Sequence, residues 1–376
     1  MIRFGCHRTF VSAAAAIIGV TLTLCPVSAQ FYEVHNFVSD GFVAADHTID
    51  GFVNAWGIDA GPTTFWWVAI NGEGTARLID GSGNPQSLVV TIPAPEGSSE
   101  PSTPTGIVFN GTSDFVVSDG TNSAPSRFIF VTEDGTIAAW APTVPPPPPS
   151  HQAFIVVDDS DEGAIYKGAA LGNNGSANFL YVTNFHEGTV DTYDGNFAEV
   201  DTPGGFVDAT IPQGFAPFGI RNLDGELFVT YAMQDEDAED DVAGPGLGYV
   251  NVFDTNGNLL RRFVSRGKLN APWGIAAAPA NFGLFSNDIL IGNFGDGRIN
   301  AYNRSNGTFR GRLRQPNGQP IEIDGLWGIS FGNGTMAGPT NTLFFAAGPD
   351  DEEHGLFGSI TAVSGNGNGN GNGDDD

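Results

Sequence analysis

The chain has 376 residues, of which 43 are acidic and 15 basic, giving a formal net charge of −28 at pH 7. A field this negative repels phosphate backbones and anionic lipid headgroups, which argues against nucleic acids as partners and against electrostatic docking on membranes. Hydrophobic residues form 40 % of the chain and charged residues 15 %, so it can bury a core, and its 52 Gly and 29 Phe favour short strands joined by tight turns.

Residues 1–29 are predicted to be a secretory signal peptide. Arg3 and Arg8 supply the positively charged start, residues 11–24 form an apolar stretch, and Val27-Ser28-Ala29 is a suitable cleavage site. The apolar stretch is shorter than the ~20 residues that a membrane-spanning helix needs. We therefore expect cleavage near Ala29, secretion to the periplasm or the extracellular space, and no membrane anchor in the mature chain.

An internal repeat runs through residues 30–363. A Gly followed by an apolar residue recurs at intervals of roughly fifty residues. An apolar run follows each copy, then a turn that usually contains an acid and Gly, then a second alternating run, a pattern that predicts strand, turn, strand. The six copies are Trp56-Gly57-Ile58, Thr105-Gly106-Ile107, Lys167-Gly168-Ala169, Phe218-Gly219-Ile220, Trp273-Gly274-Ile275 and Trp327-Gly328-Ile329.

Six copies of about fifty residues, each with four short strands, predict an all-β fold, a six-bladed β-propeller over residues 30–363. The sixth copy ends at Thr361-Ala362-Val363 without an outer strand. Phe37-Val38-Ser39 precedes the first copy much as Phe263-Val264-Ser265 precedes the fifth, so it is predicted to be the outer strand of the last blade and to close the ring. Residues 364–376, rich in Gly, Asn and Asp, are predicted to be a disordered tail.

Several longer segments resemble an uncharacterised family of secreted bacterial proteins, many of which carry a PEP-CTERM sorting signal. The segments include NAWGID, YKGAAL, LNAPWGIAAAPANFG, IGNFGDGRINAY and DGLWGISFGNG, and the resemblance covers residues 31–363. It implies a six-bladed propeller related in fold to TolB-like, NHL-repeat and gluconolactonase-type propellers. It implies no established activity, and this chain ends in GNGNGNGNGDDD where many relatives have an apolar anchor.

The repeat also predicts a ligand-binding face. The inner strand of a blade begins on the face where the second strand ends, so residues before each Gly and residues in the following turns should meet around one mouth of the central channel. The acid–Gly pairs are equally typical of hairpin turns, and the tryptophans of packing between blades. The residues predicted at this mouth are Trp56, Asn71, Glu73, Lys167, Asn184, Glu187, Phe218, Trp273, Asn293, Asp296 and Trp327.

The densest acidic group falls at the same turn of the sixth copy. Its carboxylates suit a cation such as Ca²⁺, although a run of like charges is also typical of a solvated loop. The acidic stretch 234–241 occupies the matching region of the fourth copy, so both loops are predicted to flank one negatively charged mouth. The candidate metal ligands are Asp350, Asp351, Glu352, Glu353 and His354.

Two functions stay open at this point. The chain contains no G-x-S-x-G nucleophile motif and no H-x-x-x-H zinc spacing, so no catalytic residue is assigned. The first hypothesis is a non-enzymatic binding propeller that uses the channel mouth for a small molecule, a glycan or a protein. The alternative is a Ca²⁺-dependent hydrolase of the lactonase type, with the metal held by Glu73, Asn184, Asn293 or Asp296.

Overall fold

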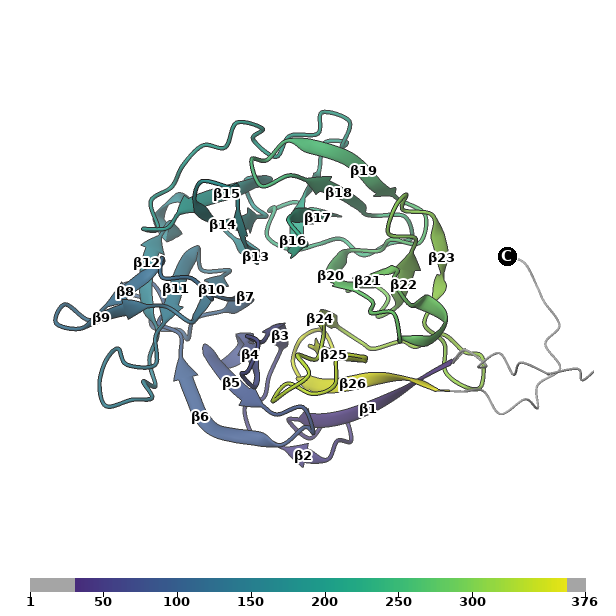
Figure 1. Cartoon of the computed structure of the whole chain (residues 1–376), viewed down its shortest axis with the longest axis horizontal. Coiled ribbons are helices and arrows are strands. Elements are labelled where there is room, and N and C mark those ends of the chain that lie inside the picture. The colour runs from purple at the N-terminus through teal and green to yellow at the C-terminus, as the bar shows by residue number, and fades with distance from the viewer. Residues whose placement is uncertain (1–30, 364–376) are drawn as a thin grey trace, which may run out of the picture.

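The computed structural model of this chain describes residues 31–363, so the predicted signal peptide, 1–29, and the predicted tail, 364–376, lie outside the described residues. Besides strands, the described part has three single-turn 3-10 helices, η1 (Asn71–Glu73), η2 (Ser160–Glu162) and η3 (Gly283–Phe285). No helix within it has the length and apolar character needed to cross a membrane. Six sheets surround a central axis (Figure 1), which confirms the predicted six-bladed propeller.

Each sheet is one blade, and its strands follow one another outward from the axis. The inner strands are β3 (Ala55–Asp59), β7 (Pro104–Phe109), β13 (Tyr166–Asn173), β16 (Phe215–Leu223), β20 (Pro272–Ala277) and β24 (Leu326–Phe331). The second strands are β4 (Trp66–Ile70), β10 (Phe128–Thr132), β14 (Asn178–Asn184), β17 (Glu226–Met233), β21 (Ile289–Asn293) and β25 (Thr342–Ala347). The third strands are β5 (Thr75–Ile79), β11 (Thr136–Trp140), β15 (Thr189–Asp194), β18 (Tyr249–Phe253), β22 (Ile299–Tyr302) and β26 (Leu356–Val363). The outer strands are β6 (Pro85–Thr91), β12 (Phe154–Asp158), β19 (Leu259–Ser265), β23 (Phe309–Arg312) and β1 (Phe31–Ser39).

The N-terminal strand closes the ring. β1 pairs antiparallel with β26, from Phe31 opposite Val363 to Ser39 opposite Leu356, and the two lie side by side in Figure 1. β2 (His47–Thr48) adds a short parallel strand beyond β1, while β8 (Val116–Ser118) and β9 (Ser123–Pro125) form a separate hairpin. The prediction that Phe37–Ser39 belongs to the outer strand of the last blade is confirmed.

The third blade departs from the predicted four strands. Its sheet has only three strands, β13, β14 and β15, within residues 31–363. The segment after β15 makes a single bridge, between Tyr193 and Glu199. Pro203 then removes a backbone donor, and Phe197 and Phe206 adopt positive φ, so residues 195–214 continue as a loop.

The Gly of each copy is explained by the close approach of neighbouring inner strands. A Cβ atom on Gly57 would lie 2.3 Å from the Thr105 carbonyl oxygen, and one on Gly219 would lie 2.2 Å from the Trp273 carbonyl oxygen. Each of these oxygens belongs to the inner strand of the next blade. The remaining copies meet the next blade in the same way, at Gly106, Gly168, Gly274 and Gly328. The repeated Gly is therefore a requirement of ring packing.

Tyr32 ties the N-terminal strand to the fifth blade. This fully buried side chain donates a hydrogen bond from its hydroxyl to the Phe282 carbonyl oxygen, 3.0 Å away, and accepts one from the Phe285 backbone N–H at 3.2 Å. Burial raises the pKa of Tyr32 to about 12, so the hydroxyl remains a donor across the neutral pH range. The contact joins β1 to the segment around η3.

Tyr32→Phe is expected to lower the free energy of unfolding by about 1–3 kcal/mol, because the buried Phe282 carbonyl and Phe285 N–H lose a shared partner. Urea unfolding followed by tryptophan fluorescence measures the change. Tyr302→Phe is the matched control, since the Tyr302 hydroxyl is also buried but bonds to no other group in residues 31–363. Equal losses in the two variants would contradict a specific role for the Tyr32 hydroxyl.

Candidate functional site

Aromatic side chains from several blades meet at the mouth where the inner strands begin. Trp56 and Trp327, each 1 % exposed, stack with ring centroids 3.7 Å apart, and Phe294 stacks on Trp327 at 3.9 Å. Trp273 meets both tryptophans edge-on. We call this group, together with Phe185 and Phe218, the aromatic layer. Four of the predicted mouth residues, Trp56, Phe218, Trp273 and Trp327, belong to it, and the burial of Trp56 and Trp327 agrees with the packing interpretation rather than with a sugar-stacking platform.

Lys167 is a buried cation next to the aromatic layer. Its side chain is 2 % exposed, and its Nζ lies 2.5 Å from Glu133 Oε1 and 3.4 Å from Asp240 Oδ1. The same Nζ lies 5.4 Å from the centroid of the Trp56 ring. Burial alone would lower the pKa of Lys167, but the attraction of Glu133, Asp240 and Glu352 outweighs it and raises the pKa above its ordinary value. Lys167 is therefore charged at neutral pH.

Loops from different blades bring carboxylates to this lysine. Glu133 follows β10 in the second blade, Asp240 and Asp241 follow β17 in the fourth, and Glu352 follows β25 in the sixth. We call these four acids and Lys167 the acidic mouth. The two acidic loops approach the same mouth. Asp240 Oδ1 lies 3.4 Å from Lys167 Nζ. Glu352 accepts a hydrogen bond from Asn54, which is itself hydrogen-bonded to Trp327.

Two asparagines hold these carboxylates in place. Asn71 donates from its Nδ2 to Glu133 Oε2 at 2.8 Å, and Asn54 donates from its Nδ2 to Glu352 Oε2 at 2.5 Å. Trp327 in turn donates from its indole N–H to Asn54 Oδ1 at 3.2 Å. A continuous chain of hydrogen bonds thus connects the aromatic layer to the carboxylates above it.

Two carboxyls of the acidic mouth have pKa values shifted to near neutrality. Burial is the largest cause for both and raises the pKa of Glu352 and that of Asp241 to about 7. Repulsion from Glu133 raises the pKa of Glu352 further, and repulsion from Asp240 raises that of Asp241, whereas Lys167 lowers both. The charge of this mouth therefore changes with pH around neutrality.

The remaining predicted mouth residues bond within their own blades. Glu73 pairs with Arg77 at 3.0 Å, Asn184 donates to Asp191, and Asn293 donates to Asp296. Glu187 is exposed in a turn. The Gly after Glu73, Glu187 and Asp296 has positive φ in each case, as a turn requires. These acid–Gly pairs agree with the turn interpretation, and the structure does not bring them together as a ligand set.

The acidic segment of the sixth copy also fails to form one cluster. Glu352 turns inward to Asn54, whereas His354 pairs through Nδ1 with Asp40 Oδ2 at 2.5 Å and stacks on Phe42. Positive φ at three successive residues, Asp350, Asp351 and Glu352, turns the chain sharply, and Asp350, Asp351 and Glu353 remain exposed. Across residues 31–363, no three His, Cys, Asp or Glu side chains are grouped as ligands for a metal ion. The geometry does not assemble the predicted calcium ligands.

Sequence reasoning missed Glu133, Asn54 and Asp241 as individual mouth residues. Asn54 is the first residue of the NAWGID segment, and a second Asn-Ala pair begins at Asn270, just before the fifth inner strand. This repeated Asn before an inner strand is the feature of the sequence that could have identified Asn54. Asp241 was included only within the acidic stretch 234–241. Nothing in the sequence distinguishes Glu133, which pairs with Lys167, from Asp134 beside it, whose Oδ2 accepts a hydrogen bond from the Thr103 backbone N–H.

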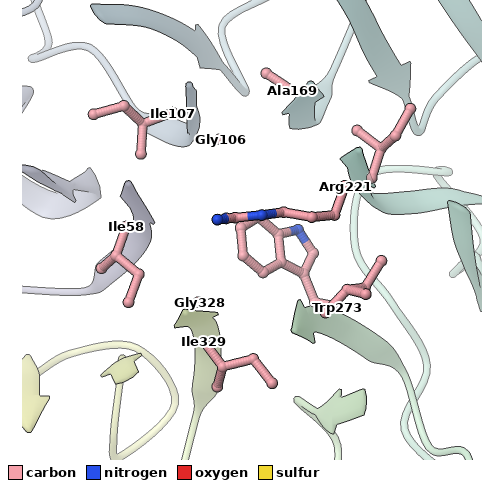
Figure 2. Close-up of a pocket in the computed structure, with 10 residues that line it drawn as sticks. Ile58, Gly106, Ile107, Ala169, Arg221, Trp273, Gly328 and Ile329 are labelled. Carbon is pink, nitrogen blue, oxygen red and sulfur yellow. The ribbon is translucent and has the colours of Figure 1, made fainter. Parts of the chain in front are cut away.

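Below the aromatic layer the central channel narrows to a cavity of about 30 Å³. Figure 2 shows Ile58, Ile107, Ala169 and Ile329 around the channel, with the side chain of Arg221 reaching across it. Each apolar residue directly follows the Gly of its copy, so the repeat motif also makes the channel wall. The channel is filled by side chains between its two ends.

Comparison with known proteins places this chain among uncharacterised proteins. No family model matches it. It is 33 % identical to the uncharacterized protein L690 of Acanthamoeba polyphaga mimivirus over 88 % of this chain and 85 % of that protein. It is 32 % identical to the uncharacterized protein R648 of the same virus over 88 % of this chain and 80 % of that protein.

Solved structures show the fold. A Bacteroides thetaiotaomicron protein of unknown function aligns with a TM-score of 0.55 and 10 % identity over 88 % of this chain and 76 % of that chain. The aldose sugar dehydrogenase of Escherichia coli aligns with a TM-score of 0.51 and 11 % identity over 88 % of this chain and 100 % of that chain. Virginiamycin B lyase of Staphylococcus aureus aligns with a TM-score of 0.50 and 14 % identity, again over 88 % and 100 %.

These findings support one part of the predicted resemblance and correct the other. The structural neighbours share the propeller fold, as expected. The sequence relatives are mimivirus proteins, so the assignment to a bacterial PEP-CTERM family was wrong. The chain belongs to the family of uncharacterised proteins that includes mimivirus L690 and R648.

Proposed function

We propose that this chain is a ligand-binding propeller that takes a small organic cation, such as a primary amine, at the acidic mouth. The observation that carries the proposal is the excess of carboxylates around Lys167. Glu133, Asp240, Asp241 and Glu352 come from three blades. The Lys167 ammonium pairs with Glu133 and Asp240, and its charge lowers the pKa of Asp241 and that of Glu352. No strand pairing or turn within a blade requires this arrangement.

The excess of carboxylates leaves a buried oxygen without a hydrogen bond and raises the pKa of two carboxyl groups. Removing charged groups from water is costly unless each is paired and hydrogen-bonded. Asp241 Oδ2 is buried and accepts no hydrogen bond from residues 31–363, and the pKa of Asp241 and that of Glu352 are raised to about 7. An ammonium group bound at the acidic mouth would supply the missing positive charge.

The overall charge supports the same ligand class. A net charge of −28 draws cations towards the protein, and an acidic mouth concentrates them at one place. We also propose, from the predicted signal peptide, that binding takes place in the periplasm or outside the cell. Ca²⁺ binding is tested in parallel, because the carboxylates of the acidic mouth would also attract this cation.

Titration of the full chain with hexylamine is expected to show saturable binding that is at least about tenfold tighter at pH 8 than at pH 6. Glu352 and Asp241, with pKa values of about 7, are ionised at the higher pH and largely neutral at the lower one, while the amine is protonated at both. Isothermal titration calorimetry measures the affinity and, in buffers of different ionisation enthalpy, the protons released on binding.

Matched variants separate the acidic mouth from general charge. Glu352→Gln is expected to weaken amine binding by about tenfold or more, because it removes a carboxylate of the mouth. Glu353→Gln removes the same charge from the exposed neighbouring residue and is expected to leave the affinity unchanged. Equal effects of the two variants, or the absence of saturable amine binding, would contradict the proposal. Tight Ca²⁺ binding without amine binding would favour the metal-dependent alternative.

A further inference from the structure

The end of the channel away from the acidic mouth contains a second cavity. Its walls come from the ends of the inner strands, three positions after Trp56 at Asp59 and three positions after Phe218 at Arg221. Three residues of a strand span about 10 Å, so the two mouths are separate sites. The cavity has a volume of about 280 Å³, just below the ~300 Å³ at which pockets for drug-sized molecules begin. We call it the opposite mouth.

Arg221 is the positively charged group of the opposite mouth. Its Nη2 donates to Ser330 Oγ at 2.9 Å and lies 3.4 Å from Asp59 Oδ1, which is longer than an ordinary charge-assisted hydrogen bond. Asp59 is already held by the Phe109 backbone N–H, which donates to Asp59 Oδ2 at 2.8 Å. The guanidinium side chain is 32 % exposed. Arg221 is therefore only partly neutralised by its one acidic neighbour.

The donors of Arg221 are not all used. A guanidinium has five N–H donors, and both hydrogen bonds to protein groups leave from Nη2. Within residues 31–363, Nε and Nη1 of Arg221 donate to no protein atom. A guanidinium with one free edge suits a carboxylate, which accepts two parallel N–H donors.

Most of the other residues that line the cavity have apolar side chains. Ile107, Val108 and Phe109 line one side and Ala169, Ala170 and Leu171 another. The polar Asn222 is already satisfied, since its Nδ2 donates to the Leu171 carbonyl and its Oδ1 accepts from the Gly225 N–H. One free guanidinium edge beside apolar side chains fits a molecule with one carboxylate and an apolar body.

We infer that the opposite mouth binds a small monocarboxylate with an apolar body, with its carboxylate on Arg221 and its body against Ile107, Phe109 and Leu171. This site is independent of the acidic mouth, which attracts the opposite charge. The repeat motif explains why it was missed in the sequence, because Arg221 occupies a position that carries no charge in most other copies.

Calorimetric titration of the full chain in about 0.15 M salt, which screens its long-range negative field, tests the inference. The probes are acetate, hexanoate and 3-phenylpropanoate, with 3-phenylpropanamide as the uncharged counterpart. We expect saturable binding of 3-phenylpropanoate that is at least about tenfold tighter than that of acetate or of the amide, because only this probe uses both the guanidinium and the apolar side chains. No saturable binding of any of the three carboxylates would overturn the inference.

Variants locate the site. Arg221→Met is expected to weaken 3-phenylpropanoate binding by about tenfold or more, whereas Arg304→Met, at an exposed arginine paired with Asp224, leaves it unchanged. Arg221→Lys keeps the charge without the planar fork and is expected to bind more weakly than the wild type, which preserves the test if Arg221→Met does not fold. Unchanged affinity in the Arg221 variants that fold would overturn the inference. Glu352→Gln should not affect carboxylate binding, so this site and the acidic mouth can fail separately.

Discussion

Lys167→Met is expected to destabilise the fold by about 3–5 kcal/mol at pH 8, the typical cost of removing one partner from a buried ion pair. Glu133, Asp240 and Glu352 would then face one another with no cation between them. Urea unfolding measures the loss. Lys268→Met is the matched control, because Lys268 is the other lysine of the chain and is exposed.

The loss in Lys167→Met is expected to be much smaller at pH 5 than at pH 8. The pKa values of Glu352 and Asp241, about 7 with Lys167 present, rise further without its positive charge. A carboxyl whose pKa is higher in the folded than in the unfolded state holds more protons when folded, so its stability contribution falls as pH rises through this interval. The same loss at both pH values would contradict the electrostatic role of Lys167. Adding Glu133→Gln should recover part of the stability at pH 8.

Gly219→Ala is expected to lower the free energy of unfolding by about 3 kcal/mol, the upper end of the usual cost of overpacking. The new Cβ would lie 2.2 Å from the Trp273 carbonyl oxygen, a backbone atom of the next blade that cannot move without opening the ring. Thermal or urea unfolding measures the change.

Substitutions at two further glycines are expected to cost less stability than Gly219→Ala. At Gly168 the nearest atom, the Phe218 carbonyl oxygen, would lie 3.1 Å from a new Cβ, so Gly168→Ala should cost less than Gly219→Ala. Gly111 is exposed, and its nearest contact would be the Phe109 ring at 3.3 Å, so Gly111→Ala should be almost neutral. A similar cost at all three positions would show that lost backbone flexibility, not contact between blades, explains the Gly of the repeat.

The acidic mouth and the opposite mouth differ in how far the repeat predicts them. The position of each inner strand follows from its Gly-apolar motif. In the structure the residues just before these motifs lie together, namely Trp56, Lys167, Phe218, Trp273 and Trp327. The turn residues were placed less well, because a side chain in a turn can face the channel or bond its own blade with the same backbone spacing. Glu133 faces Lys167, while Glu73 pairs with Arg77 four residues away.

The acidic segment of the sixth copy also shows that the sequence does not predict where side chains in a turn point. Its composition indicated a cluster of carboxylates suited to a cation, but the positive φ angles of Asp350, Asp351 and Glu352 send successive side chains in different directions. Only Glu352 reaches the channel mouth, and there it accepts a hydrogen bond from Asn54. Local charge density alone does not predict which carboxylates converge.

The length, the excess of acidic residues and the abundance of Gly are properties of the sequence alone, and the repeat within it determined a closed ring of six blades. A repeat determines strand order because each copy must bury the same apolar positions against its neighbours. Only the tertiary structure decided which acids surround Lys167 and that Arg221 lines a second cavity, because these contacts join residues of different blades. The distances between these residues depend on how whole blades are rotated and spaced around the ring. No single copy of the motif carries that information.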